Sequence, residues 1–582
     1  TLGALTIRDR AGSPNIMDSR WVIRLKKMPD GTLVVKARLC IRGFKDSQID
    51  MLDTFAGTAS RYGQRAVNII AATKRWLLWS LDVSQAFLKG LTFEEVSRLT
   101  GKPLRSVQLV SPKGAAALLQ RIPGFEKFDP VRHVLDMLRP GFGLKDAPRL
   151  WHLRIDEVLR QLKYTPLVSD PQLYCCWSSS DYSLDTLQMV CSKHVDDLKG
   201  ASPEPVFDQL CRELSKHFGD LTIQKRQSEH LGTLHVQNED YSVSCSQDHY
   251  VKQLRLISLD SLGTDEEEVV TDMDLVSSYS SLVGGAAWTL ITRSDVSVHI
   301  GALQRRLHAP RVQDFKALNT VVRWMKRRPC TLLHVAIPAP WTLLVMPDSA
   351  FKATEPDCLA TRACIIMLTT SIGGARPAMP TGGPVGVVEL YSRKQPRVCR
   401  STFSAELTSV DDASSIGLLI RGMFSEIIQG PMTAADLAYK TEHGQLAVGL
   451  DIGTDNKGLF SGATATEVRV PSEPHLFYIL KALRDRLEAK AIDSLWWFDT
   501  RDMVCDAMTK GTLSREPLLA LWRTAMLQII GEAPQVWRAT GSTDTTTVAT
   551  PTTQTTRTTD DAGGRPRRPL VPRRALSIDS YF

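Results

Sequence analysis

Several features that assign proteins to a class are missing from this sequence. It has no secretory signal peptide and no apolar run long enough to cross a bilayer. Its 11 cysteines are scattered singly apart from Cys175 and Cys176, without a Cys-x-x-Cys pair or the Cys/His spacing of a zinc site. These absences argue against membrane-spanning, disulfide-rich and zinc-finger proteins. We expect thiols of a reducing, intracellular compartment, cytoplasm or nucleus.

An initiator methionine is also missing, since the chain begins at Thr1, and we expect a fragment or a processed piece of a longer product. The 582 residues predict two to four domains, and 43% hydrophobic and 23% charged residues are globular values. The net charge of +8 permits a nucleic-acid partner without demonstrating one.

A His-Val-Asp-Asp step, His194 to Asp197, lies between two short apolar, β-prone runs. This pattern predicts a β-hairpin with its acids at the bend. Adjacent carboxylates repel each other, so a pair held together usually needs a cation. A third acid, Asp82, follows another strand-like run, and three carboxylates around divalent metals are typical of phosphoryl transfer. The alternative is a solvated turn, because Asp is common in turns.

The first half of the chain alternates hairpin and helix patterns. Residues 18–45 predict a hairpin around Pro29-Asp30-Gly31, whose basic residues (Lys36, Arg38, Arg42 and Lys45) either grip phosphate or form a solvated strand face. Further patterns predict helices within 60–78, 138–162 and 205–218, a hairpin over 230–247, and a mostly helical stretch over 276–327.

The pattern resets near residue 340, where strands and helices begin to alternate as in a mixed α/β domain. Residues 541–582 are Thr-rich and then basic, and we expect them to be disordered because they cannot bury a core. The basic run GGRPRRPLVPRR is either a solvated tail or a patch for RNA binding or nuclear import.

Nine blocks now carry a resemblance to a known family. They are KARLCIRGF (36–44), LDVSQAFLKG (81–90), GLKDAPRLW (143–151), HVDDLKG (194–200), HLG (230–232), LVGGAAWTLITRSD (282–295), YSRKQPRVCRSTFSAELTSV (391–410), TDNKGL (454–459) and DTRDMVCDAMTKG (499–511). In content and order they resemble the reverse transcriptase and RNase H region of copia-type LTR-retrotransposon polyproteins. The resemblance covers roughly residues 18–515.

The resemblance implies an α/β (α+β) chain: a right-hand polymerase fold with fingers, palm and thumb, then an RNase H-like mixed α/β domain. The implied boundaries are a leader (1–17), fingers and palm (18–250), a mostly helical thumb or connection (251–335), the RNase H-like domain (336–515), a C-terminal helix (516–540) and a disordered tail (541–582).

It also implies an RNA-directed DNA polymerase with RNase H activity. The partners would be an RNA template, a DNA primer, dNTPs and the RNA–DNA hybrid, with two Mg²⁺ (or Mn²⁺) ions per active site. The implied catalytic and metal-binding acids are Asp82, Asp196 and Asp197 for the polymerase and Asp348, Glu406, Asp455 and Asp506 for the nuclease. The implied nucleotide-binding residues are Lys36, Arg38, Phe87, Gly143, Lys145 and Arg149, and Leu231-Gly232 would lie near the primer end.

Three departures from the family pattern bear on activity. His194 replaces the usual Tyr of the acidic hairpin, and Asp146 replaces a Gln, where it would repel a triphosphate unless it points away or pairs with Lys145 or Arg149. SEPHLFYIL, with His475, stands where the family has Lys-His-Ile-Asp. Two alternatives therefore stay open: a non-catalytic nucleic-acid-binding relic, or a nuclease with a dead polymerase.

Overall fold

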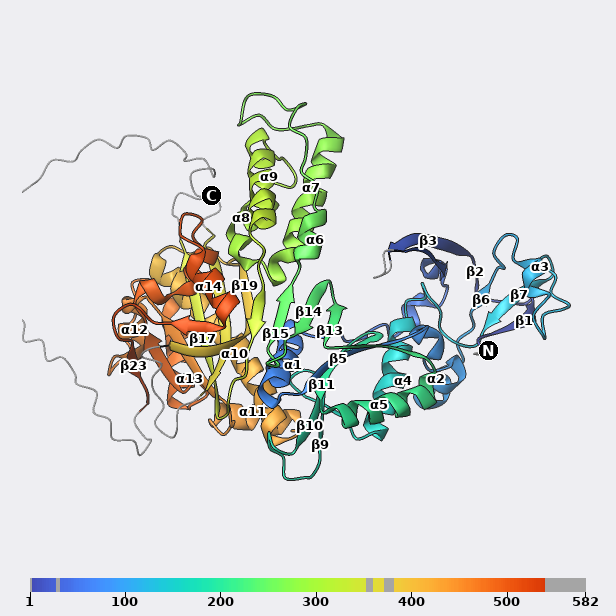
Figure 1. Cartoon of the computed structure of the whole chain (residues 1–582), viewed down its shortest axis with the longest axis horizontal. Coiled ribbons are helices and arrows are strands. Elements are labelled where there is room, and N and C mark those ends of the chain that lie inside the picture. The colour runs from blue at the N-terminus through green and yellow to red at the C-terminus, as the bar shows by residue number, and fades with distance from the viewer. Residues whose placement is uncertain (1–2, 28–31, 352–358, 371–381, 540–582) are drawn as a thin grey trace, which may run out of the picture.

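The computed structural model describes residues 3–27, 32–351, 359–370 and 382–539. The predicted turn at 29–31 and the tail at 541–582 lie outside the described residues. The described part is a mixed α/β structure with five sheets, as the sequence predicted at this level (Figure 1). None of its helices is both long and apolar enough to cross a membrane.

A six-stranded antiparallel sheet lies near the middle of the molecule. Its order is β12-β5-β11-β10-β9-β8, with bounds β5 Leu77–Val83, β8 Thr165–Pro166, β9 Leu173–Trp177, β10 Leu187–His194, β11 Asp197–Ser202 and β12 Leu221–Lys225. Because side chains alternate along a strand, Trp79 and Leu81 pack against α4 (Ala147–Gln161) and α5 (Glu204–Phe218). Leu78 instead faces the cluster that contains α1 (Arg61–Lys74).

The N-terminal region forms two smaller sheets. β3 (Ser19–Lys27) and β4 (Leu33–Ile41) pair as a two-stranded ribbon, seen at the right of Figure 1. A second sheet has the order β1-β7-β6-β2. Its elements and neighbours are β1 Leu5–Asp9, β2 Ile16–Met17, β6 Gln108–Leu109, β7 His133–Met137, α2 Phe93–Thr100, α3 Ala116–Leu119 and the 3₁₀ turn η3 Ala86–Lys89.

A four-stranded sheet and a helical column connect the two halves. The sheet order is β13-β14-β15-β16, with β13 Gln227–His230, β14 Thr233–Gln237, β15 Val243–Ser246 and β16 Leu332–His334. The column contains α6 Asp248–Gln253, α7 Met273–Trp288, α8 Ser297–Gln304 and α9 Val312–Arg327, which pack around one apolar cluster. Residues 276–327 are thus mostly helical, as the pattern predicted.

The C-terminal half is built on a seven-stranded sheet of order β22-β19-β18-β17-β20-β21-β23. The strands are β17 Trp341–Ala350, β18 Thr361–Thr370, β19 Gly382–Lys394, β20 Gly449–Thr454, β21 Ser494–Trp497, β22 Met526–Gln528 and β23 Gln535–Trp537. The helices are α10 Thr402–Gln429, α11 Ala434–Glu442, α12 Lys457–Thr464, α13 Leu476–Glu488 and α14 Glu516–Thr524, with the 3₁₀ turn η7 Val504–Met508.

The stretch 516–540 differs from the helix that the sequence predicted. Helix α14 ends at Thr524, Ala525 takes a left-handed conformation (φ 52°), and β22 follows at once. Met526–Gln528 pair with the start of β19, and Gln535–Trp537 pair with β21. Strand pairing at the two edges of the sheet therefore replaces the helix expected after Thr524.

Two candidate carboxylate sites

The His-Val-Asp-Asp step forms the predicted hairpin. β10 and β11 pair antiparallel up to His194 opposite Asp197, which leaves Val195 and Asp196 as a two-residue loop. Val195 has φ 56°, and the Trp151 indole N–H of α4 donates to its carbonyl oxygen at 2.7 Å. Asp82 on β5 lies directly opposite Asp197 on β11. The structure therefore brings two of the three predicted acids into register and holds the third at the loop.

The electrostatics of this first site favour a cation. Burial raises the pKa of Asp197 to about 6, and the carboxylates of Asp196 and Asp82, the latter also hydrogen-bonded to Asp197, add to the rise. The three acids do not bring one oxygen each within 4.8 Å of one another, since among the described residues only another group meets that spacing. Ionised carboxylates repel one another when no counter-ion lies between them, so the three side chains stay apart.

A buried polar pair lies beneath the loop, and the sequence did not point to it. Lys193 is buried and its Nζ lies 2.8 Å from His152 Nδ1 on α4. Burial lowers the pKa of Lys193 to about 8, with Asp156 opposing the shift. Together with Trp151 this pair ties the acidic hairpin to α4. The only signal in the sequence was His152, which directly follows the GLKDAPRLW block.

Three of the predicted nucleotide-binding residues converge around one aromatic pair. Phe87 meets Phe142 edge-on, with ring centroids 5.1 Å apart, and the Arg38 guanidinium lies over the Phe142 ring at 5.5 Å. Gly143 has φ +98°, and a Cβ there would lie 2.1 Å from the Ile41 carbonyl oxygen. Only glycine fits this crossing, which docks the end of β4 on the loop before α4.

The other basic residues of this region are placed differently. Lys36 and Lys145 are exposed, while Arg149 pairs with Asp53 at 3.1 Å. Arg42 and Lys45, which the even spacing grouped with Lys36, both pair with Asp18. The ribbon thus presents Lys36 and Arg38 to solvent, whereas Arg42 and Lys45 are tied to its base.

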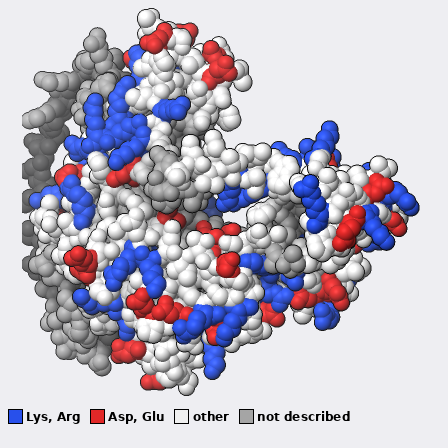
Figure 2. Space-filling view, turned by 45° about the vertical axis from the view of Figure 1, so that its right-hand side comes forward, with Lys and Arg blue, Asp and Glu red and all other residues white. Residues whose placement is uncertain are grey.

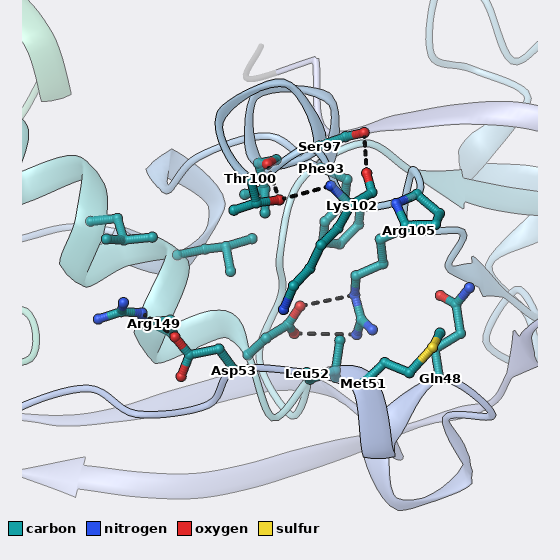
Figure 3. Close-up of a pocket in the computed structure, with 15 residues that line it drawn as sticks. Gln48, Met51, Leu52, Asp53, Phe93, Ser97, Thr100, Lys102, Arg105 and Arg149 are labelled. Atoms are coloured by element: carbon teal, nitrogen blue, oxygen red, sulfur yellow. Dashed lines mark hydrogen bonds and ion pairs between the residues drawn. The ribbon is translucent and has the colours of Figure 1, made fainter.

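Asp146 neither points freely into solvent nor pairs with Lys145 or Arg149. It is buried at the start of α4, and Arg105 binds it at 2.9 Å and Asp46 at 2.7 Å. Figure 3 shows Arg105 in the wall of an apolar cavity of about 520 Å³, with Arg149 and Asp53 on the opposite side. The Arg105 guanidinium is shared by two carboxylates, so it offsets part of the charge of Asp146 and reduces the repulsion that the sequence raised.

The HLG block forms the tight turn between β13 and β14. Leu231 (φ 51°) and Gly232 (φ 73°) are both left-handed, and His230 pairs with Thr233 across the turn. This is the geometry of a two-residue hairpin loop. A Cβ on Gly232 would lie 2.7 Å from the Trp288 indole nitrogen, so the turn packs closely on the end of α7.

A second carboxylate site lies on the seven-stranded sheet. Asp348 comes from β17, Glu406 from the second turn of α10, and Asp455 directly follows β20, which runs parallel to β17. Oxygens of these three side chains lie within 4.8 Å of one another. Asp506 joins them from η7 by a side-chain hydrogen bond to Asp348. All four acids that the sequence placed far apart therefore meet.

This second site carries its own cation. Lys510 lies 2.9 Å from Asp506 and 3.5 Å from Asp348, and the Thr509 hydroxyl donates to Asp348. Burial would lower the pKa of Lys510, but the neighbouring carboxylates raise it above its ordinary value. Burial and Asp348 raise the pKa of Asp506 to about 8, and burial followed by Asp348 and Asp455 raises that of Glu406 well above its usual range.

The donor set of the second site fits a hard divalent cation. Glu406 Oε2 and Asp506 Oδ1 are buried, and no described residue gives them a hydrogen bond. Buried carboxylate oxygens are nearly always paired, and oxygen ligands are what Mg²⁺ prefers. The group Asp348, Glu406 and Asp455 could therefore hold a metal ion. His475 lies in the segment that replaces the Lys-His-Ile-Asp step of the family, and it is placed at the start of α13.

The chain is similar in sequence to several known proteins. No protein-family model matches the chain. The chain is 23% identical over 430 residues to the Retrovirus-related Pol polyprotein from transposon RE1 of Arabidopsis thaliana, which covers 71% of this chain and 26% of that protein. The corresponding polyprotein from transposon RE2 of Arabidopsis thaliana is 23% identical over 424 residues, which covers 69% of this chain and 26% of that protein. The Retrovirus-related Pol polyprotein from transposon TNT 1-94 of Nicotiana tabacum is 25% identical over 334 residues, which covers 53% of this chain and 23% of that protein.

The chain thus spans about a quarter of the length of these curated relatives. Identity of 23–25% is distant, but it extends over much of the chain. The chain is a distant relative of copia-type retrotransposon Pol polyproteins.

Proposed function

We propose that this chain is an RNA-directed DNA polymerase with RNase H activity on RNA–DNA hybrids. One observation carries the proposal: a chain similar to Pol polyproteins holds two separate groups of acids, one on each of its two largest sheets. Figure 2 shows acidic and basic side chains gathered around the hollow of one face, which is where a nucleic-acid backbone and metal ions would both find partners.

In the first site, Asp82, Asp196 and Asp197 would hold Mg²⁺ (or Mn²⁺). The bound metal would neutralise phosphate charge and make the primer hydroxyl more acidic. Residues of the chain position these acids: Trp151 donates a hydrogen bond to the Val195 carbonyl of the loop, and the antiparallel register sets Asp197 opposite Asp82. Phe87 would lie under the sugar of a dNTP, and Arg38, Lys36 and Lys145 would bind its phosphates, with Gly143 allowing the loop to approach.

In the second site, Asp348, Glu406, Asp455 and Asp506 would hold the metal that serves RNA cleavage. Glu406 and Asp506 have raised pKa values in the metal-free protein, so loading requires them to release protons. Lys510 would balance the charge of Asp348 and Asp506 when no metal is bound. Thr509 orients Asp348 from the opposite side.

Primer extension on an RNA template tests the polymerase half of the proposal. The full chain should extend a DNA primer with dNTPs and Mg²⁺ or Mn²⁺, and Asp196→Asn should not. Asp208→Asn, which changes an exposed acid on α5, is the matched control and should retain extension. Tight binding of the hybrid by the parent chain without any extension would contradict the polymerase assignment.

A nuclease without polymerase activity is the second candidate. The observation that favours it is that only the second site brings three acids within 4.8 Å among the described residues. His194 beside the first site also leaves its Nδ1 buried without a partner. Cleavage of labelled RNA in a hybrid, lost in Asp455→Asn, together with failed primer extension would select this candidate.

A further inference from the structure

The cavity of about 520 Å³ shown in Figure 3 lies between α2, the 3₁₀ turn η2 (Ile49–Met51) and the start of α4. Its floor is apolar, because Phe93 and Leu150 lie there with only 3% and 4% of their surface exposed. Met51 is 67% exposed at the rim. Small-molecule sites typically measure about 300–1,000 Å³, so this cavity has room for a whole small ligand.

The cavity is separate from both carboxylate sites. None of the acids assigned to those sites lines it, and of the residues assigned to the dNTP only Arg149 does. The guanidinium of Arg149 is already held by Asp53, with Nε 3.1 Å from a carboxylate oxygen. A ligand in this cavity would therefore be additional to the nucleotide and the metal ions of the proposed function.

The charges around the cavity disfavour an ionic ligand. Arg105 lies between Asp146 at 2.9 Å and Asp46 at 2.7 Å, and two carboxylates beside one guanidinium repel a further anion. The ion pair on the opposite side of the cavity is balanced, and the exposed Lys102 at the rim adds a positive charge. Acids and basic residues therefore match in number, and a ligand needs no charge of its own.

The buried polar atoms of the lining that lack a hydrogen bond are all donors. They are Nε and Nη1 of Arg105 and Nε of Arg149, and no oxygen of a lining residue is in this state. Both Nε atoms lie close to carboxylate oxygens in the ion pairs, at 2.9 and 3.1 Å. Arg105 Nη1 is left without an acceptor on a side chain that is only 10% exposed. Buried donors are nearly always paired, so an acceptor is missing here.

The rest of the lining favours an apolar body. Its hydroxyl and amide oxygens already have partners: Ser97 donates to the Lys102 carbonyl oxygen, Thr100 donates to that of Val96, and Gln48 Oε1 accepts from the Ser106 N–H. Further polar groups on a ligand would lose their water and find no partner on this wall, which is costly. An apolar molecule with a single acceptor therefore fits best.

We propose that this cavity binds a small, uncharged and mostly apolar molecule with one hydrogen-bond acceptor, such as a ketone or an ester. Arg105 Nη1 donates to the acceptor. The apolar body packs on Phe93, Leu150 and Leu153, so that it joins α2 to α4. The competing content is water: at about 30 Å³ each, roughly 17 molecules fill this volume, and the apolar floor offers them few partners.

Equilibrium dialysis of the full chain against three related probes tests the proposal. Benzophenone is uncharged and has one carbonyl group, diphenylmethane has a similar shape without the acceptor, and 4-benzoylbenzoate adds a negative charge. EDTA is present and nucleic acid is absent, so the result is independent of the proposed polymerase and nuclease functions. We expect benzophenone to bind about tenfold more tightly than diphenylmethane, the effect of one hydrogen bond to a charged group, and more tightly than 4-benzoylbenzoate.

Two variants on α2 locate the binding. Val96→Trp fills part of the cavity and should weaken benzophenone binding by at least about tenfold. Leu99→Trp, at a position that is 72% exposed and outside the lining, is the matched control and should bind as the parent does. Benzophenone should raise the melting temperature of the parent chain and of Leu99→Trp only, and melting without ligand shows that each variant is folded. Equal binding by Val96→Trp and the parent would overturn the proposal.

Arg105→Lys separates the hydrogen bond from the apolar packing. Lysine keeps a positive charge for Asp46 and Asp146 but has no Nη1. The preference for benzophenone over diphenylmethane should fall from about tenfold to less than about twofold. Because both probes are compared on one variant, the preference does not depend on how stable that variant is. An unchanged preference, equal binding of the two probes by the parent chain, or a cavity that takes up water only and no benzophenone would overturn the proposal.

Discussion

The two carboxylate sites solve the same electrostatic problem in different ways. In the seven-stranded sheet, acids from four elements converge in a buried position, and Lys510 supplies a positive charge within ion-pair distance of two of them. In the six-stranded sheet, Asp197 shares a hydrogen bond with Asp82, and its pKa rises to about 6. The seven-stranded sheet thus keeps its acids compact with an internal cation as well as raised pKa values on Glu406 and Asp506, whereas the six-stranded sheet has only the raised pKa of Asp197 to limit the repulsion.

On the proposed assignment, this difference gives two ways in which acids can be held close together before a metal ion binds. A site with an internal ammonium should tolerate loss of metal, and its geometry should change little on loading. Both sites should respond to pH, since both contain acids with raised pKa values, but the acids of the site without an ammonium should move closer together when a cation binds.

The largest effect is expected for Glu406→Gln. It should lower hybrid cleavage by at least about 100-fold, since it removes an oxygen ligand from the compact site. The pKa of Glu406 lies well above its usual range, so the neutral amide should leave the melting temperature of the metal-free protein unchanged or higher. Hybrid cleavage and the melting temperature are measured on the same preparation of the variant. Glu488→Gln, on the exposed face of α13, is the control, and cleavage within threefold of the parent by Glu406→Gln would contradict the account.

The second effect concerns pH at the six-stranded sheet. Asp197 must lose its proton before it binds a cation, so Mn²⁺ affinity should fall about tenfold per pH unit below pH 6. Because the folded pKa lies above the ordinary 3.8, the metal-free protein loses stability as the pH rises from about 4 through 6. Titration is done in a Glu406→Gln background, which removes an oxygen ligand from the other site and so weakens Mn²⁺ binding there. Affinity that is flat between pH 5 and pH 7 would show that Asp197 is not a ligand.

A smaller effect is expected for Trp151→Phe. The variant loses the hydrogen bond to the Val195 carbonyl, which should cost about 1 kcal/mol of unfolding free energy and reduce primer extension about fivefold. Trp177→Phe is matched, since Trp177 donates an equivalent bond to the Ile427 carbonyl at 3.1 Å, far from the acidic loop. Denaturant unfolding should rank the two variants together, and only Trp151→Phe should lose extension. Equal extension by both would remove Trp151 from the positioning of the loop.

The smallest effect is expected for Lys510→Met. Loss of the ammonium leaves Asp348 and Asp506 facing each other, and the metal-free protein should lose about 1 kcal/mol because Lys510 is partly exposed. The loss should be greater at pH 9 than at pH 5, since the pKa of Asp506 is about 8. Saturating Mg²⁺ should abolish the difference. Lys481→Met, which breaks an exposed pair with Asp485, provides the baseline, and an equal loss in both variants would contradict a role for Lys510 in the site.

Local patterns predicted local structure well. Apolar runs on either side of the His-Val-Asp-Asp step were enough to predict its hairpin, and the helical period predicted α1, α4 and α5. The pairing of Asp82 with Asp197 lay beyond such patterns, because the register of strands so far apart in sequence is set by tertiary packing. The same holds for Arg105, which pairs with Asp146 across 41 positions of sequence.

The second site shows the same limit. Resemblance placed its four acids in order, but their convergence depends on the parallel pairing of β17 with β20 and on the docking of α10. Lys510 was missed although it stands four residues after Asp506, a spacing at which side chains on a helical turn meet. The helix predicted over 516–540 ended at Thr524 because sheet edges were available for pairing.

The central claim is that two separate carboxylate sites serve two separate reactions. The most direct measurement assays Asp197→Asn and Asp455→Asn side by side for primer extension on RNA and for cleavage of RNA in a hybrid. We predict that Asp197→Asn loses extension by at least about 100-fold and keeps cleavage, while Asp455→Asn does the reverse. Loss of both activities in either variant, or retention of both, would contradict the account.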